Sequence, residues 1–372
     1  MIRRNELKYS SVEICAGAGG QASGLHSAGF RHVALIEIDK DACETLRANT
    51  ESNPEWDGCA VIEADLTEFR AESLALAPGK LDLLAGGVPC PPFSAAGKQL
   101  GRDDERDLFP TMLDLVDHLE PKAVMIENVR GLLDPKFADY RQFIIGRLES
   151  MGYEKCYWDI LEAKDYGVPQ LRPRAILVAM KPEYARHFEH RKPDATKQVS
   201  VGEALEDSMR ARYEAAPGPR SDEAFKKWYE KALRGVAPTV VGGSKKHGGA
   251  DLGPTRAKRA WAELGVCGLG VANEPHEMRD MDRDLFAPAG PKLTVTQAAV
   301  IQGFDEDWKF SGRKTAAYRQ VGNAFPPPVA RAVGEQIYAA FEAAEAEAKA
   351  KAERNRSRRE VPPVTAASVA AG

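Results

Sequence analysis

A cysteine and a glutamate stand at the ends of two apolar segments of this chain. Cys90 lies in the run GGVPCPPFS (residues 86–94), after an apolar segment. Each neighbouring proline fixes φ and removes a backbone donor, so this loop holds the thiol rigidly. The run Glu127-Asn128-Val129 follows another apolar segment 37 residues later. We therefore expect a nucleophile and an acid on neighbouring strand ends.

The other five cysteines (15, 43, 59, 156 and 267) are scattered without CxxC or zinc-ligand spacing. A cysteine of this kind is most often a small buried hydrophobe, and this is our interpretation of Cys43, Cys59 and Cys156. We expect no metal site and no disulfides, as in a reducing cytoplasm. A cysteine protease would need a histidine base, and none of the seven histidines lies in a comparable motif.

A glycine-rich loop follows the first apolar segment. Gly17, Gly19 and Ala22 fit the pattern G-x-G-x-x-G/A, and Glu37 comes about twenty residues later. Such a loop lets the backbone approach a ligand closely, and an acid at the next strand end can bind a diol. Asp65, after the third strand, can accept from an adenine amine. These features predict an adenosine-containing cofactor and leave a nicotinamide or flavin oxidoreductase open.

The elements around these motifs alternate between strand and helix. Apolar strand candidates cover residues 11–15, 33–38, 60–63, 81–85, 123–126, 156–161 and 175–180, and helical patterns cover 41–50 and 107–118. This alternation predicts an α/β fold with a doubly wound, mostly parallel sheet and helices on both faces.

The alternation stops after Lys181, where glycine, proline and charged residues increase. We expect a catalytic and cofactor domain from 1–185, completed by 313–350, with a helix over 329–350 packing back on the sheet. An inserted, smaller and irregular domain with a hinge would cover 186–312, with a short helix at 293–304. Residues 351–372 are expected to be a disordered tail.

Composition limits the partners. The net charge is −4 and the pI about 6.1, but residues 242–261 hold five lysines and arginines against one acid and form a basic segment in an acidic protein. No apolar run approaches ~18 residues, so we expect no membrane span. The first residues lack the apolar region of a secretory signal.

Six segments together resemble the ordered motifs of the S-adenosylmethionine-dependent DNA (cytosine-5) methyltransferases. They are residues 11–20, 86–99, 127–129, 170–174, 293–304 and 320–323, spread over about 11–330. The resemblance implies the Rossmann-like fold of class I methyltransferases, with the inserted domain as the target-recognition domain. It also implies methylation of a flipped-out cytosine in a specific duplex DNA sequence, with S-adenosylmethionine as the donor.

The resemblance also implies residue roles. Cys90 would add to cytosine C6, and Glu127 would hydrogen-bond or donate a proton to cytosine N3. Arg172 and Arg174 would hold the cytosine O2 and the adjacent phosphate. Cys15 stands where a phenylalanine usually lies against the cofactor, so an aromatic face is missing there. The residues expected to bind the cofactor are Cys15, Ala16, Gly17, Gly19, Gly20, Glu37, Ile38, Asp65, Leu66, Pro89 and Asn323. Those expected to contact DNA are Ser94, Gln170, Lys245, Lys246, Arg256, Lys258 and Arg259.

The alternatives at this stage are a transfer-RNA cytosine-5 methyltransferase with the same chemistry, the oxidoreductase, and a non-catalytic DNA-binding relative. The long insertion with its basic glycine-rich segment favours DNA. We expect a cytoplasmic, nucleoid-associated protein of bacterial type that acts as a monomer on duplex DNA, with a cognate restriction endonuclease as a possible partner.

Overall fold

The computed structural model describes residues 7–89, 107–193, 198–216, 220–242 and 249–360. Cys90, Ser94, Lys245 and Lys246, which the sequence singles out, lie outside these ranges. Within them, no helix is both long enough and apolar enough to cross a bilayer.

Seven strands form one sheet in the order β3-β2-β1-β4-β5-β7-β6. The strands are β1 (Tyr9–Ile14), β2 (Phe30–Glu37), β3 (Ala60–Glu63), β4 (Leu83–Gly86), β5 (Ala123–Val129), β6 (Glu154–Glu162) and β7 (Pro173–Met180). The pairs among β1 to β5 are parallel, and β7 runs antiparallel to both of its neighbours. The mostly parallel, doubly wound sheet expected from the sequence is confirmed.

Helices cover both faces of the sheet, because alternate strand residues point to opposite sides. On one face, Leu84 and Val124 pack against α3 (Phe109–Leu119) and α4 (Ala138–Ser150). On the other, Leu83 and Met125 pack in one cluster with α1 (Gly20–Ser27) and α12 (Pro327–Glu360). Helix α2 (Lys40–Thr50) also belongs to this half.

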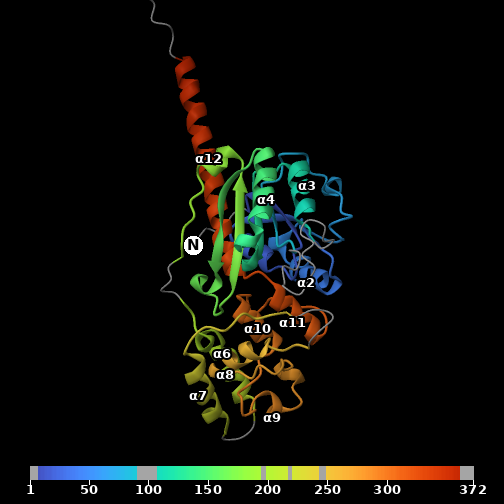
Figure 1. Cartoon of the computed structure of the whole chain (residues 1–372), viewed down its shortest axis with the longest axis vertical. Coiled ribbons are helices and arrows are strands. Elements are labelled where there is room, and N and C mark those ends of the chain that lie inside the picture. The colour runs from blue at the N-terminus through green and yellow to red at the C-terminus, as the bar shows by residue number, and fades with distance from the viewer. Residues whose placement is uncertain (1–6, 90–106, 194–197, 217–219, 243–248, 361–372) are drawn as a thin grey trace, which may run out of the picture.

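Helix α12 returns the C-terminal end of the chain to the sheet, as the sequence predicted. An added Cβ on Gly24 of α1 would lie 2.3 Å from the Pro327 carbonyl oxygen, so the two helices touch backbone to backbone. The expected tail is wrong over 351–360, because α12 continues to Glu360. Figure 1 shows this end of the helix projecting from the larger body, on the side away from the small domain. Residues 361–372 lie outside the described ranges.

The inserted part contains two long helices, so the expectation of an irregular domain is wrong over α6 (Val201–Glu214) and α7 (Arg220–Ala232). Leu205 and Met209 of α6 join Trp228 of α7 in a core that also includes Trp261. The other helices of this half are α8 (Thr255–Glu263), α9 (Met281–Asp284), α10 (Val295–Gln302) and α11 (Lys314–Asn323), and a short α5 (Pro182–Ala185) precedes them. Figure 1 places α6 to α9 below the sheet, with α10 and α11 between.

Short 3-10 helices occupy several connections: η1 (Pro54–Trp56), η2 (Ala71–Leu74), η4 (Arg130–Leu133), η5 (Pro135–Phe137), η6 (Ala163–Tyr166) and η8 (Pro275–Glu277).

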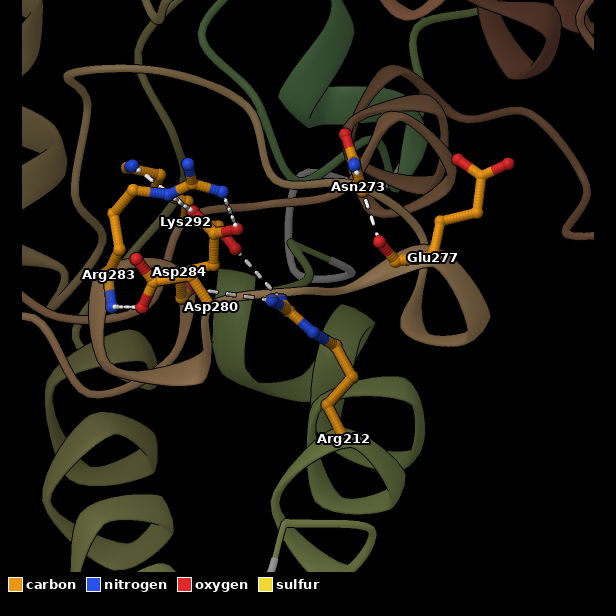
Figure 2. A network of polar contacts seen from close by, with 7 residues as sticks. All are labelled: Arg212, Asn273, Glu277, Asp280, Arg283, Asp284 and Lys292. Carbon is orange, nitrogen blue, oxygen red and sulfur yellow. Dashed lines mark hydrogen bonds and ion pairs between the residues drawn. The ribbon is translucent and has the colours of Figure 1, made fainter.

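A polar network joins α6 to α9 and to the segment between α9 and α10 (Figure 2). Arg212 donates to the Lys292 carbonyl oxygen at 2.8 Å and to Gln297 Oε1 at 2.7 Å. Asp284 is buried and accepts from Arg283 at 2.6 Å and from Lys292 at 3.2 Å. These partners hold the pKa of Asp284 below its usual value, with Arg283 the largest contributor. The network joins α6 to α10, the first helix that leads back to the sheet.

Candidate active site

The strand order of the sheet fixes the place of the site. The chain runs outward from β1 through β2 to β3, then returns to β4 on the other side of β1. Ligands bind in α/β sheets at the carboxyl ends of the strands where the order reverses. The glycine loop follows β1, and Pro89, the neighbour of Cys90, follows β4. The two sequence motifs therefore meet at the switch point of the sheet.

A cavity of about 320 Å³ lies at this point, and its size suits a small cofactor. Eight of the eleven residues expected to bind the cofactor line it: Cys15, Gly17, Glu37, Ile38, Asp65, Leu66, Pro89 and Asn323. Ala16, Gly19 and Gly20 are not among the described residues of its wall. An added Cβ on Gly20 would lie 2.2 Å from the Phe325 carbonyl oxygen, so this glycine serves close packing.

Two carboxylates in this cavity are arranged to accept further hydrogen bonds. Glu37 accepts from the N–H groups of Gly17 at 2.7 Å and of Ile38 and Asp39 at 2.8 Å, which ties the end of β2 to the glycine loop. Asp65 Oδ1 accepts from the hydroxyl and N–H of Thr67, and these bonds lower the pKa of Asp65. Each carboxylate oxygen has two lone pairs, so both groups can still accept from a ligand.

Cys15 and Ile38 supply the apolar part of the cavity. Cys15 adopts φ 51°, a left-handed conformation that is uncommon for a residue with a side chain. Burial and the neighbouring Glu37 raise the pKa of its thiol to about 12, so the thiol is neutral. Ile38 is 62% exposed although it is aliphatic. A ligand with an aromatic ring would cover this side chain.

Trp308 supports the glycine loop and was not anticipated from the sequence. Its indole N–H donates to the Ala18 carbonyl oxygen at 3.0 Å. An added Cβ on Gly19 would lie 2.8 Å from the Trp308 ring. No local pattern predicts this contact, because Ala18 and Trp308 are 290 residues apart.

A second cavity of about 510 Å³ contains the predicted acid. Glu127, Asn128, Arg172 and Arg174 line it, together with a wall formed by residues 239–242. Gly87, Pro89 and Asn323 line both cavities. The residue directly before Cys90 therefore separates the cofactor cavity from the cavity of Glu127.

Strand register brings Arg174 to Glu127. Val129 pairs with Arg174 across β5 and β7, and Glu127 lies two residues from Val129 on the same face. A long side chain spans such a diagonal. Arg174 Nε lies 2.7 Å from Glu127 Oε1, and Nη1 donates to the Pro173 carbonyl oxygen. The two side chains are 14% and 15% exposed.

Burial and two arginines act on the pKa of Glu127 in opposite directions. Burial raises the pKa of Glu127, and the charges of Arg174 and Arg172 oppose this shift without cancelling it. Asn128 fixes the same strand end by donating to the Val88 carbonyl oxygen at 2.9 Å. A carboxyl group held in this way is suited to share a proton with a ligand.

Arg172 and Gln170 are both buried, and the interpretation of Gln170 as a DNA contact is wrong. Arg172 is 1% exposed and donates at 2.8 Å to the carbonyl oxygens of Val240, Gly322 and Ala324, and its Nε has no hydrogen-bond partner among the described residues. Gln170 is fully buried, donating to Gln302 and accepting from the Val240 N–H, so it cannot contact DNA. Both side chains fix the wall at 239–242.

The basic residues of α8 behave differently from one another. Arg256 and Arg259 are exposed. Lys258 lies 2.9 Å from Asp251, which balances its charge. Arg256 and Arg259 are thus better placed than Lys258 to meet an anionic partner.

The sequence matches the family described as C-5 cytosine-specific DNA methylase over residues 9–339. It is 52% identical over 333 residues to Type II methyltransferase M.NaeI of Lentzea aerocolonigenes, covering 88% of this chain and 74% of that one. It is 48% identical over 341 residues to Type II methyltransferase M.NgoMIV of Neisseria gonorrhoeae, covering 90% and 99%.

Solved structures share the fold. A Spodoptera frugiperda DNMT2 variant has a TM-score of 0.59 at 16% identity, with 90% of this chain and 100% of that one covered. A DNA modification methyltransferase encoded within an E. coli prophage has a TM-score of 0.58 at 19% identity, with the same coverage.

The family match excludes the oxidoreductase left open by the glycine loop, because one family accounts for that loop and for the motifs around Cys90 and Glu127 together. The chain belongs to the C-5 cytosine-specific DNA methylases, which transfer a methyl group from S-adenosylmethionine to C5 of cytosine in DNA.

Proposed function

We propose that this protein methylates a cytosine within one defined duplex DNA sequence, as the modification enzyme of a type II restriction–modification system. The names of the relatives M.NaeI and M.NgoMIV support this role. The observation that carries the site assignment is the shared wall of the two cavities. Gly87, Pro89 and Asn323 border both the cofactor cavity and the cavity of Glu127.

In this proposal Cys90 is the nucleophile. Its thiolate adds to cytosine C6, and the electron pair of the C5–C6 double bond moves so that C5 becomes nucleophilic and N3 gains a proton. S-adenosylmethionine, when bound, supplies an electrophilic methyl group to C5. A base then removes the C5 proton, and the electrons of that C–H bond re-form the C5–C6 double bond as the thiolate leaves C6. N3 returns its proton to Glu127.

Glu127 provides the proton at N3. A carboxyl group with an ordinary pKa would be ionised at neutral pH, whereas burial raises the pKa of Glu127. Arg174 orients the carboxyl through its Nε contact at 2.7 Å. We assign the remaining N–H donors of the Arg174 guanidinium to the cytosine O2. Arg172 is a positioning residue.

The cofactor cavity fits S-adenosylmethionine in shape and polarity. We assign the ribose hydroxyls to Glu37 and the adenine amine to Asp65, since both carboxylates keep free lone pairs. Ile38 provides an apolar face for the adenine ring, and Gly17 leaves the backbone open to the methionine part. Cys15 offers a small neutral thiol in place of an aromatic face.

The small domain delivers the base. The target C6 is shielded by stacking within duplex DNA, so the cytosine must leave the helix. We assign phosphate contacts to Arg256 and Arg259, which are exposed. Lys245 and Lys246 remain predicted contacts of the same kind. The functional division at 1–185 with 313–350 and at 186–312 is part of this proposal.

Expression in an unmethylated bacterial host, followed by bisulfite sequencing, tests the function and gives the recognition sequence. Methylation confined to one short sequence is expected. Purified protein with labelled S-adenosylmethionine is then offered duplex DNA or transfer RNA; label entering transfer RNA alone would overturn the choice of DNA.

The covalent role is tested by Cys90→Ala, with Cys156→Ser as the matched control. Cys156 lies in β6 at the far edge of the sheet. Cys90→Ala should abolish methyl transfer and leave cofactor binding nearly intact, whereas Cys156→Ser should keep both. Near-normal turnover of Cys90→Ala contradicts the adduct.

The assembly and setting are also proposals. We propose a monomer on DNA, in the cytoplasm with the nucleoid, beside a cognate endonuclease. Light scattering of the protein on a duplex with one recognition sequence should give the mass of one chain per duplex, and a mass of two chains would refute the monomer.

A further inference from the structure

The described wall of the cofactor cavity contains three acidic residues and one basic residue. The acids are Glu37, Asp39 and Asp65, and the base is Arg319 of α11. Arg319 is half-buried, and within the described ranges its guanidinium has no ion pair and no hydrogen bond. An arginine whose planar fork has no partner in the protein can use all of its donors for a ligand.

One face of α11 forms a side of this cavity, because its lining residues are spaced i, i+1, i+4 and i+5. They are Arg319, Gln320, Asn323 and Ala324, the last directly after the helix. Gln320 is already engaged within the protein, because it accepts from the Thr45 hydroxyl of α2 at 2.6 Å. Arg319 and Asn323 are one turn apart and are neighbours on this face. The long polar side chain that this face offers to a ligand is therefore Arg319.

Arg319 lies at the end of the cofactor cavity that adjoins the cavity of Glu127. An added Cβ on Gly242 would lie 2.4 Å from the Arg319 carbonyl oxygen and 2.4 Å from Asn323 Oδ1. Gly242 lines the cavity of Glu127, and Asn323 lines both cavities. The methyl group of the donor must lie near this shared wall to reach cytosine C5. The amino-acid chain is bonded to the same sulfur as that methyl group, so it lies at the end of the cavity where Arg319 stands.

The charges of S-adenosylmethionine match those of the cavity. The cofactor carries two cationic groups, a sulfonium and an ammonium, and a single carboxylate. The acids of the wall attract the cations and repel the carboxylate. Of the described charged residues that line the cavity, Arg319 alone attracts the carboxylate. A guanidinium also matches a carboxylate in shape, since two parallel N–H donors meet its two oxygens.

We propose that Arg319 binds the carboxylate of the methionine part of S-adenosylmethionine. This inference rests on the placement of the cofactor in this cavity, and it gives the anionic group of the cofactor a side-chain partner in addition to the backbone of the glycine loop. Arg319 then determines specificity, because a ligand with the same adenosine and sulfonium but no carboxylate gains nothing from the guanidinium.

The test compares two ligands that differ in this one group. S-adenosylmethionine and decarboxylated S-adenosylmethionine share the adenosine, the sulfonium and the ammonium group. Calorimetric titration without DNA measures the affinity of each ligand for wild type, Arg319→Ala, Arg319→Lys and Arg313→Ala. Arg313 is the matched control, being an exposed arginine at the start of the same helix. Its side chain makes no capping hydrogen bond, and it is not among the described residues that line the cavity.

Wild type should bind S-adenosylmethionine roughly 10-fold to 100-fold more tightly than the decarboxylated ligand, as expected for a charge-assisted, hydrogen-bonded pair. Arg319→Ala should lose about this factor for S-adenosylmethionine, and it should bind the decarboxylated ligand no more than about threefold more weakly than wild type does. Arg319→Lys keeps the charge without the planar fork and should recover part of the lost affinity. Arg313→Ala should match wild type with both ligands.

Equal weakening of both ligands by Arg319→Ala would mean that Arg319 supports the cavity without touching the carboxylate, and it would overturn the proposal. Unchanged affinity for S-adenosylmethionine would overturn it as well, and weaker binding of duplex DNA by the same variant would then assign the guanidinium to a phosphate. A wild type that binds neither ligand would instead mean that the placement of the cofactor in this cavity fails.

Discussion

Replacing Arg172 tests whether this side chain holds backbone segments in place or contacts the substrate. Its guanidinium donates to three backbone carbonyl oxygens, all at 2.8 Å, that belong to two separated segments of the chain. In Arg172→Lys a single ammonium nitrogen replaces a planar fork and cannot reach both segments with good geometry. We therefore expect one or two buried carbonyl groups to lose their donors.

The size of the effect follows from these bonds. Hydrogen bonds to charged groups contribute ~1.5–3 kcal/mol each, and their losses at one side chain are not additive. Removing one partner from a buried, charged hydrogen-bonded group lowers the free energy of unfolding by about 3–5 kcal/mol. An unfolding entropy of about 2.1 cal/mol/K per residue then gives, for the 372 residues of the chain, a Tm lower by roughly 4–6 °C.

Scanning calorimetry and kcat/KM on the cognate duplex measure the two consequences separately. Arg174→Lys is the matched control, because Arg174 contacts Glu127 and, within the described structure, donates to one backbone carbonyl, that of Pro173. It should lose activity with a Tm shift of less than about 2 °C. If Arg172→Lys loses activity while its Tm stays within about 1 °C of wild type, Arg172 acts on the substrate and the positioning argument is refuted.

Three further outcomes are expected. Arg174→Ala removes a cation that lowers the pKa of Glu127, so this pKa should rise further. Because the proposed mechanism needs the protonated acid, the fall of residual kcat/KM at alkaline pH should move to higher pH. An alkaline limb at unchanged or lower pH contradicts this. Trp308→Phe loses the indole N–H hydrogen bond to the glycine loop, and such a bond contributes ~0.5–1.5 kcal/mol. Calorimetric titration should therefore show S-adenosylmethionine binding that is weaker by about 2-fold to 12-fold. Unchanged affinity would mean that this hydrogen bond does not support the glycine loop. Gly242→Ala places a Cβ 2.4 Å from backbone and side-chain oxygens of α11 and should lower both cofactor affinity and the rate of methylation. Gly235→Ala, whose added Cβ has no atom within 4 Å, should change neither. Equal effects of the two variants would refute the explanation by packing.

Local patterns predicted the sheet well, because its inner strands, such as β4 and β5, are short apolar runs buried on both faces. The predicted strand at 60–63 coincides with β3. The placement of the glycine loop and Glu37 at strand ends also followed from sequence, whereas the strand order that makes this the switch point comes from the fold.

The helices of the small domain were missed for a physical reason. Helix α6 buries Val201, Leu205 and Met209, spaced four residues apart, while its outer face is charged. A narrow apolar stripe of this kind is diluted in any measure of composition. The charge and glycine content between the helices then dominated the interpretation.

The roles of Gln170 and Arg172 could not be predicted, because their partners are distant in the chain. Arg172 binds carbonyl oxygens 68 to 152 residues away. The resemblance to the family's motif at 170–174 assigned both side chains to the substrate, and their residue types agreed with that, since arginine and glutamine read bases and phosphates in many proteins. Only the fold shows that backbone carbonyls use their donors first.

The contacts of residues 240–242 show why the two substrates must be aligned by the same structure. An added Cβ on Gly322 would lie 2.1 Å from the Gly242 nitrogen, so this segment and the end of α11 touch without intervening side chains. Asn323, the next residue, lines both cavities. A contact between backbones has few alternative geometries, because no rotamer can adjust it. Moving the wall of the base cavity therefore moves Asn323 in the cofactor cavity. Methyl transfer requires the donor and C5 to be held at a fixed separation. The chain meets that requirement by building both cavities on one rigid contact, to which Arg172 adds its three bonds.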